Sequence, residues 1–337
     1  MTLCVAWIRA KNSVEELIFA TDSSLTGGEK WNQGIKLFEL PRPDCLICFA
    51  GSTARAYPLI LNLVASIKLS KRLQSPRTDI EEVLNYLSSL FTSLVHTIIN
   101  EISGMDIHEL RSEAKFLFGG WSWLQSRFRI WQLYYSKDAE GFVFQEYTDD
   151  PSKTRIYAFM GDPDDLIHEA SKRYKQELID NDKLDDKLDM EPLKILIEMS
   201  RENTIRFVDG AIQIGKIYKS GTLEFFGIYW KSIQEKPHFQ GRAFEFHSKP
   251  DVRYFDPDSL LVIEDKLPDV IFNLNQFSQL EDFEFIRSCY NREGCLKEDI
   301  SENDRERLIF VFREAAYQYF IDDLKSRGVQ DNDSDHD

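Results

Sequence analysis

The sequence begins with MTLCVAW, residues 1–7, an apolar run that is typical of a β-strand and has Thr2 as its second residue. A start methionine is normally removed when the next side chain is small. Removal of Met1 would leave Thr2 with both a hydroxyl group and a free α-amine. Such a residue carries its own base, so this stretch predicts an N-terminal threonine nucleophile.

The bulk composition excludes several classes of partner. The 337 residues include 57 acidic and 41 basic ones, for a formal net charge of −16, and no block of lysine and arginine indicates binding to nucleic acid or to an anionic membrane. No apolar run approaches the roughly 20 residues of a transmembrane helix, and no signal peptide is recognised. Five cysteines, an odd and sparse set, favour a reduced, cytoplasmic compartment.

The hydrophobic periodicity predicts strands, two helices, strands, two helices and again strands. The expected strands are 2–9, 16–22, 36–40, 45–49, 115–118, 127–135, 141–147, 155–160, 211–218 and 223–230. The expected helices are 52–73, 78–102, 164–179 and 191–204. This order favours an α+β fold in which helical pairs cover two stacked sheets, a four-layer αββα sandwich.

The regular alternation of strands and helices ends near residue 231. We therefore expect a domain over residues 1–231 and a C-terminal extension of unknown role over residues 232–330. The extension includes an expected helix at 302–327, and residues 331–337 form an acidic tail.

Four short motifs follow one another on the expected strands. Ala20-Thr21-Asp22 ends the second strand and Thr26 follows four residues after Asp22; Lys36 precedes Leu37-Phe38-Glu39-Leu40; Phe49-Ala50-Gly51 leads into the first helix; and Gly119-Gly120 ends a later strand. In this order and spacing the first 230 or so residues resemble the N-terminal-nucleophile hydrolases of the proteasome β-subunit and HslV type. The resemblance implies the αββα sandwich and hydrolysis of peptides or other amides.

The resemblance also implies roles for individual residues. Lys36 would lower the pKa of the Thr2 amine and stabilise negative charge on the Thr2 oxygen, and Asp22 would hold Lys36 in place. The backbone N–H of Gly51 would stabilise the oxyanion. Each of these residues also has a simpler interpretation, because Lys36 and Asp22 can form an ordinary salt bridge and Ala-Gly often marks a tight strand-to-helix turn.

Substrate contacts are implied in the same way. Thr26 would offer backbone hydrogen bonds to an extended peptide, which would bind as an added strand. Leu25 and Phe49 would line the side-chain pocket, where the phenylalanine would favour small substrate residues.

Two positions depart from the pattern of the family. Asp162 stands where active members have a serine after a glycine, and segment 204–210 lacks the expected aspartate and serine, although Asp209 is adjacent. These acidic replacements leave two alternatives open. The chain is either a divergent enzyme or a catalytically inactive scaffold or regulatory subunit that binds a partner through its C-terminal region.

Other motifs give weaker signals. Cys45 and Cys48 have CxxC spacing, but an offset of three on a strand directs the two thiols to opposite faces. The six histidines show no ligand spacing, so we predict no metal and no cofactor.

The leading hypothesis is a threonine-nucleophile peptidase or amidohydrolase that acts through an ester on Thr2. The resemblance implies a homo-oligomer, in rings for many members, with an ATPase as a further partner. An acylase that takes small amides is a third alternative.

Overall fold

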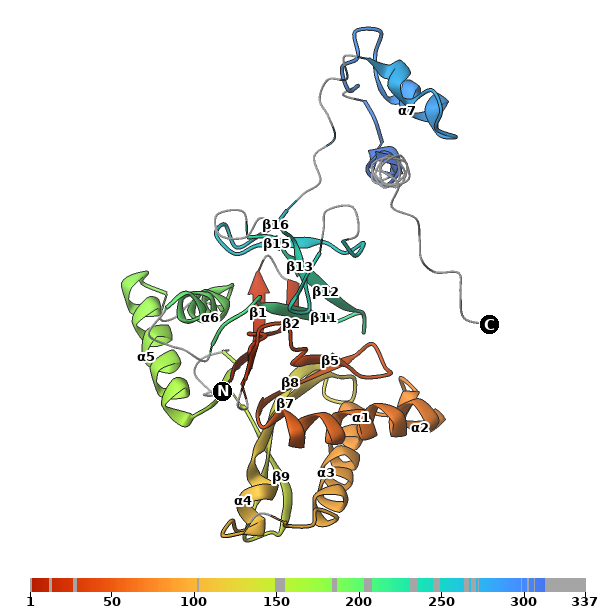
Figure 1. Ribbon diagram of the computed structural model, residues 1–337. Helices are drawn as coiled ribbons and strands as arrows, with labels where there is room; N and C mark the ends of the chain where they lie inside the picture. The colour runs from red at the N-terminus through yellow and green to blue at the C-terminus, as the bar shows by residue number, and fades with distance from the viewer. Residues whose placement is uncertain are drawn as a thin grey trace. The chain divides into compact units, whose positions relative to one another are not determined.

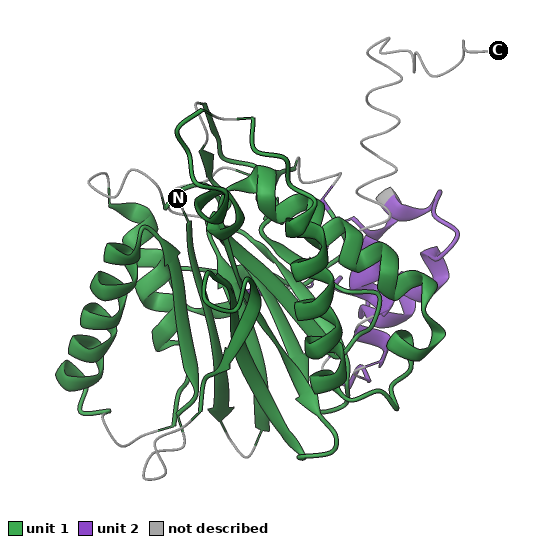
Figure 2. Cartoon of the chain, turned by 90° about the horizontal axis from the view of Figure 1, so that it is seen from below, with its two compact units in different colours: residues 1–244, 250–262 green, residues 245–249, 263–337 purple. Residues whose placement is uncertain are grey.

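The computed structural model describes residues 2–11, 14–26, 29–101, 103–148, 155–183, 187–202, 208–230, 236–244, 249–263, 267, 271, 273–297, 299–301, 303–305 and 307–312. The chain divides into two compact units (Figure 2). Unit 1 comprises residues 1–244 and 250–262, and unit 2 comprises residues 245–249 and 263–337. The expected domain boundary at residue 231 stays a prediction.

The strands lie close to the expected positions, with additional short strands after residue 230. Their bounds are β1 Thr2–Lys11, β2 Val14–Thr21, β3 Leu25–Thr26, β4 Lys30–Trp31, β5 Leu37–Glu39, β6 Cys45–Gly51, β7 Ala114–Ser122, β8 Arg127–Ser136, β9 Gly141–Glu146, β10 Tyr157–Asp162, β11 Gln213–Tyr218, β12 Leu223–Ile228, β13 His238–Phe239, β14 Arg242–Ala243, β15 Tyr254–Asp256 and β16 Leu261–Ile263.

The helices of unit 1 fall between these strands. Their bounds are α1 Thr53–Leu69, α2 Lys71–Gln74, α3 Ile80–His96, α4 Ile107–Ser112, α5 Asp164–Asp180 and α6 Glu191–Arg201. Figure 1 shows α5 and α6 beside β1 and β2, and α1 and α3 beside the strands β7 to β9. Among the described residues, no helix is both long and apolar enough to cross a membrane.

Two sheets organise the described part of unit 1. The first has the order β10-β1-β2-β11-β12-β13-β14, with β15 joined to β12 and β16 joined to β15. The second has the order β5-β6-β7-β8-β9, and β3 and β4 form a separate hairpin. In the first sheet β1 lies between β10 and β2. In its pairing with β10 the first residue, Thr2, lies opposite Asp162.

Alternate residues of β1 belong to different hydrophobic clusters, as the two-residue period of a strand requires. Leu3, Val5 and Trp7 pack with α5 and α6. Cys4 and Ala6 pack with side chains of the second sheet. A third cluster joins the outer face of the second sheet to α1 and α3. On the basis of these clusters we propose the four-layer αββα arrangement for unit 1.

The second expected helix, at 78–102, is shorter in the structure. Asp79 caps its start by accepting a hydrogen bond from the Glu81 N–H at 3.2 Å. The helix ends at His96, and Ile99 beyond it is 81% exposed, so Ile99 provides no core contact that would extend the helix. The separate helix α4 follows, which the periodicity did not predict.

Unit 2 has a small apolar core of its own. Its described elements are a 3₁₀-helix, η2 Leu274–Phe277, and α7 Phe283–Cys289. Residues 303–305 and 307–312 are helical, whereas the rest of the helix expected at 302–327 and the tail at 331–337 lie outside the described residues. The buried side chains of this core are Ile271, Ile286, Cys289, Tyr290, Leu308 and Val311.

Candidate active site

Thr2 is buried at the start of β1, with only 2% of its surface exposed. Its side chain lies on the same strand face as Cys4 and Ala6, the face that packs against the second sheet. The Thr2 Oγ1 atom accepts a hydrogen bond from the Lys36 Nζ atom at 2.6 Å. The nucleophile proposed from the sequence is therefore in direct contact with an ammonium group.

Lys36 lies immediately before β5 and is completely buried. Its Nζ atom also donates to Asp22 Oδ2 at 2.8 Å, so the lysine bridges Asp22 and Thr2. Burial of an ammonium group is costly unless it is paired and hydrogen-bonded, and both conditions are met here. We call Thr2, Asp22 and Lys36 the buried triad.

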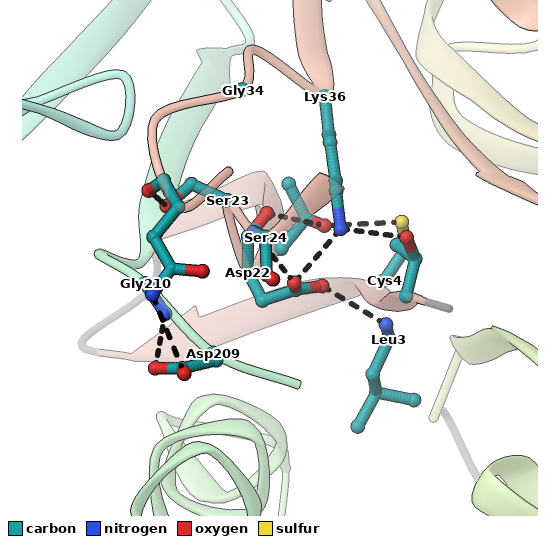
Figure 3. A network of polar contacts seen from close by, with 12 residues as sticks. Leu3, Cys4, Asp22, Ser23, Ser24, Gly34, Lys36, Asp209 and Gly210 are labelled. Carbon is teal, nitrogen blue, oxygen red and sulfur yellow. Dashed lines mark hydrogen bonds and ion pairs between the residues drawn. The ribbon is translucent and has the colours of Figure 1, made fainter. Parts of the chain in front are cut away.

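Asp22 follows β2 and is fully buried as well. Its carboxylate accepts hydrogen bonds from the backbone N–H groups of Leu3 at 3.1 Å and Ser24 at 3.0 Å, a network shown in Figure 3. Burial raises the pKa of Asp22 above its ordinary value, while Lys36 and these two N–H groups oppose the rise. The carboxylate is thus fixed by two backbone N–H groups and by its ion pair.

Gln213 of β11 holds the backbone that carries Lys36. Its side-chain oxygen accepts from the N–H of Lys36 at 3.1 Å and of Leu37 at 3.2 Å, and its amide nitrogen donates to the Gly34 carbonyl at 2.7 Å. Sequence reasoning missed this residue. A glutamine 177 residues from its partner carries no local signal, so only the fold reveals the contact.

Gly51 ends β6 directly before α1. Its φ is +102°, and a Cβ atom there would lie 2.0 Å from the Glu113 carbonyl oxygen, so only glycine fits without a shift of the backbone. The Ser52 N–H donates to that same carbonyl at 2.8 Å. Gly51 lines a cleft of about 740 Å³ together with Ser52 and Thr53 at the start of α1.

The cleft collects several of the expected substrate-binding residues. Leu25 and Thr26 of β3 line it, as does Asp162 of β10, whose backbone lies opposite Thr2. Its full lining is Leu25, Thr26, Glu29, Trp31, Ala50, Gly51, Ser52, Thr53, Ala54, Tyr57, Ser112, Glu113, Lys115 and Asp162.

Phe49 does not contribute to this lining. It is completely buried on the face of β6 that packs against α1 and α3. Its ring meets the ring of Tyr57 edge to face at 5.6 Å, and Tyr57 itself lines the cleft. The strand period therefore directs Phe49 away from the cleft, and the effect expected of it on pocket size has no structural basis.

The Asp209 side chain bonds to groups outside the buried triad, although its backbone carbonyl accepts a hydrogen bond from the Ser23 N–H, next to Asp22, at 3.2 Å. Its carboxylate forms an ion pair with Lys30 and accepts a hydrogen bond from the Gly210 N–H at 2.6 Å. Partial burial acts to raise the pKa of Asp209, but Lys30, the Gly210 N–H and Asn32 outweigh it and lower the pKa. The structure gives Asp209 a role in anchoring the loop of β4. Residues 203–207 of the neighbouring segment lie outside the described residues.

Ser24 is a second residue that the motifs did not identify. It is completely buried beside Asp22, and its Oγ atom has no hydrogen-bond partner among the described atoms. A buried hydroxyl without a partner points to an ordered water molecule or a further group at the site.

Cys45 and Cys48 face opposite sides of β6. Cys45 packs with α1 and α3, whereas Cys48 packs between the sheets. Burial raises the pKa of both thiols well above the ordinary value, which suits inert core residues. The described residues contain no group of three or more histidine, cysteine or acidic side chains placed to hold a metal ion.

Comparison with known proteins gives no match to a family model and none to a curated protein. Similar solved structures are Anbu proteins. They include the Anbu complex of Pseudomonas aeruginosa, described as a helical assembly, with 18% identity over 66% of this chain and 85% of that one and a TM-score of 0.48. Anbu of Yersinia bercovieri, described as an ancestral β-subunit, has 18% identity over 66% and 86% of the two chains and a TM-score of 0.44.

These findings correct the family assignment made from the motifs. The similar structures are Anbu proteins, and no family model places the chain with the proteasome β-subunits or HslV, so that assignment is wrong. Its motifs were short, and one of them, Ala-Gly before a helix, is favoured by strand-to-helix geometry alone. With TM-scores below 0.5, the likeness to Anbu establishes neither a shared fold nor a shared function.

Proposed function

We propose that unit 1 is a threonine-nucleophile hydrolase that cleaves peptide or other amide bonds. The observation that carries this proposal is the contact of Thr2 Oγ1 with Lys36 Nζ at 2.6 Å, with Lys36 paired in turn to Asp22 at 2.8 Å. Three polar side chains from the ends of three strands, β1, β2 and β5, are buried together, and the nearby cleft is lined by Asp162, the cross-strand partner of Thr2. Such an arrangement is expensive for a purely structural role.

The reaction begins once the bond before Thr2 has been cleaved. The freed α-amine takes the proton from Oγ1, and the oxygen attacks the carbonyl carbon of the substrate amide. The Lys36 ammonium stabilises the negative charge that develops on the threonine oxygen. The Lys36 Nζ atom donates to both Thr2 Oγ1 and Asp22 Oδ2, so the base that we assign is the amine.

The tetrahedral intermediate carries its negative charge on the former carbonyl oxygen. The N–H of Gly51, at the entry to α1, is the donor we assign to it, and the positive end of the helix dipole adds to the stabilisation. The protonated amine then gives its proton to the leaving nitrogen, which leaves an ester on Thr2. Water, deprotonated by the same amine, hydrolyses the ester and restores the threonine.

The substrate lies in the cleft lined by Gly51, Thr26 and Asp162. Thr26 belongs to the short strand β3 and offers backbone groups to an extended peptide. Assembly of the chain into a homo-oligomer and a cytoplasmic location remain predictions from the sequence.

Intact-mass spectrometry tests the proposal before and after treatment with a peptide epoxyketone, which reacts with the hydroxyl and the amine of an N-terminal threonine. We expect a mass that starts at Thr2 and one added probe molecule. Thr2→Ala should take up none, and Thr2→Ser should still react. A protein that keeps the preceding residue and takes up no probe would instead be the inactive scaffold.

A further inference from the structure

Among the described residues, two carboxylates of the cleft beside the buried triad have no counterion. Its lining includes Glu29, Glu113 and Asp162 but a single cation, Lys115. Glu113 is paired with Arg55 at 3.1 Å, and Lys115 is paired with Asp164 at 2.8 Å. For Glu29 and Asp162 the described part of the chain offers no ion pair. The cleft therefore presents net negative charge to whatever enters it.

Aromatic side chains lie in the same lining. Trp31, on β4, is 60% exposed although it is the most costly side chain to leave in water. Tyr57 of α1 also lines the cleft, and its hydroxyl donates to the Ile35 carbonyl at 2.9 Å, which fixes the ring. Aromatic faces combined with unpaired carboxylates bind a cation that carries an apolar stem.

We infer that the cleft selects peptides that carry an arginine or lysine side chain. The inference rests on the proposed function, because it names the substrate class for the same site. The cationic group would pair with Glu29, and its methylene stem would lie against Trp31. Asp162 adds negative charge beside Thr2, where its backbone is the cross-strand partner. An acidic substrate side chain would be repelled by both carboxylates.

Citrulline offers a matched test, because it has the shape of arginine without its charge. Two peptide aminocoumarin substrates that differ only in arginine or citrulline would be compared by kcat/KM. We expect a preference of about tenfold for arginine, since each partly exposed pair contributes up to roughly fivefold. The preference should shrink between about 0.1 M and about 1 M salt, because the screening length falls to roughly 3 Å.

Variants assign the preference to residues. Glu29→Gln should lower the arginine-to-citrulline ratio about threefold, and Trp31→Leu, which keeps an apolar surface, should lower it about twofold. The matched control is Asp138→Asn, which removes a carboxylate from an exposed turn between β8 and β9. This control should leave the ratio unchanged. An equal ratio in wild type and Glu29→Gln would overturn the inference.

A binding measurement separates this inference from the proposed function. Fluorescence anisotropy of labelled arginine and citrulline peptides on the Thr2→Ala variant needs no catalysis. Tighter binding of the arginine peptide, lost in Thr2→Ala/Glu29→Gln, supports the cleft assignment even if the epoxyketone does not label the wild-type protein. Labelling of Thr2 together with equal binding of both peptides would support the hydrolase function and contradict the preference for a cationic side chain.

Discussion

Two of the lysine–aspartate pairs in unit 1 differ sharply in their surroundings. Lys36 and Asp22 are both completely buried, whereas Lys30 and Asp209 are 45% and 42% exposed. The buried pair contacts a threonine hydroxyl, and the exposed pair holds a loop. Water screens the exposed pair, so it contributes little to stability. In the buried pair each charged group needs its counterion and its hydrogen-bond partners, because no water replaces them. On the proposed function, the buried pair serves the reaction and the exposed pair serves local structure.

The largest expected difference concerns reactivity. The double variant Asp22→Asn/Lys36→Met removes both charges of the buried pair and should slow epoxyketone labelling of Thr2 at least about a hundredfold, because the ammonium no longer stabilises the attacking oxygen. Lys30→Met should label within about twofold of the wild-type rate. Time-resolved mass spectrometry measures both rates. Similar slowing in the two variants would contradict a specific effect of the buried pair on the reactivity of Thr2.

The next effect concerns stability. Lys36→Met alone leaves Asp22 buried without its counterion, which should lower the free energy of unfolding by about 3–5 kcal/mol at neutral pH. Lys30→Met leaves an exposed carboxylate and should cost less than about 1 kcal/mol. Urea unfolding followed by tryptophan fluorescence gives both values. Addition of Asp22→Asn to Lys36→Met should recover much of the loss; no recovery would show that packing, and not charge, is responsible.

A smaller effect tests the loop of the exposed pair. Gly210 has φ +80°, and a Cβ atom there would lie 2.3 Å from Ser23 Oγ and 2.7 Å from the Asn32 carbonyl oxygen. Gly210→Ala should therefore destabilise unit 1 by roughly 1–3 kcal/mol and leave labelling of Thr2 measurable. Gly221→Ala is the control, because Gly221 has a similar φ of +74° with no atom within 4 Å. Equal losses would mean that backbone strain alone accounts for the effect.

The two aspartates should also give opposite dependences of stability on pH. The pKa of Asp22 is raised, so the folded state binds its proton more tightly and loses stability relative to Asp22→Asn as the pH rises above the ordinary value of 3.8. The pKa of Asp209 is lowered, so the wild type gains stability relative to Asp209→Asn as the pH rises towards 3.8. Unfolding free energies from about pH 3 to pH 7 check the two signs; slopes of the same sign would contradict the assignment.

Local sequence predicted that Thr2, Asp22 and Lys36 lie at strand ends, whereas the pairing of Lys36 with Asp22 was implied only by the resemblance, and the residue that positions Lys36 was missed. Thr2, Asp22 and Lys36 each follow or precede a strong apolar strand, so their placement at strand ends could be inferred. Phe49 was expected in the pocket, yet the strand alternation that buries Ile47 on one face of β6 buries Phe49 on the same face. Gln213 could not be found, because a contact between β11 and β5 depends on how distant segments meet. The strands β13 to β16 were also missed, because each is only two or three residues long and has no long apolar run.

The hydrogen bonds of Gln213 have a consequence for the newly made chain. The residue joins β11 of the first sheet to the segment that carries Lys36, just before β5 of the second sheet. The strand β11 itself pairs with β2, next to Asp22. The hydrogen bond from the Lys36 backbone to Gln213 can therefore form only after residue 213 has left the ribosome and β11 has docked. A partly synthesised chain contains every member of the buried triad, but the backbone on which Lys36 sits still lacks its clamp. On the proposed function, the reactive arrangement would therefore be complete only when the domain around it is nearly complete.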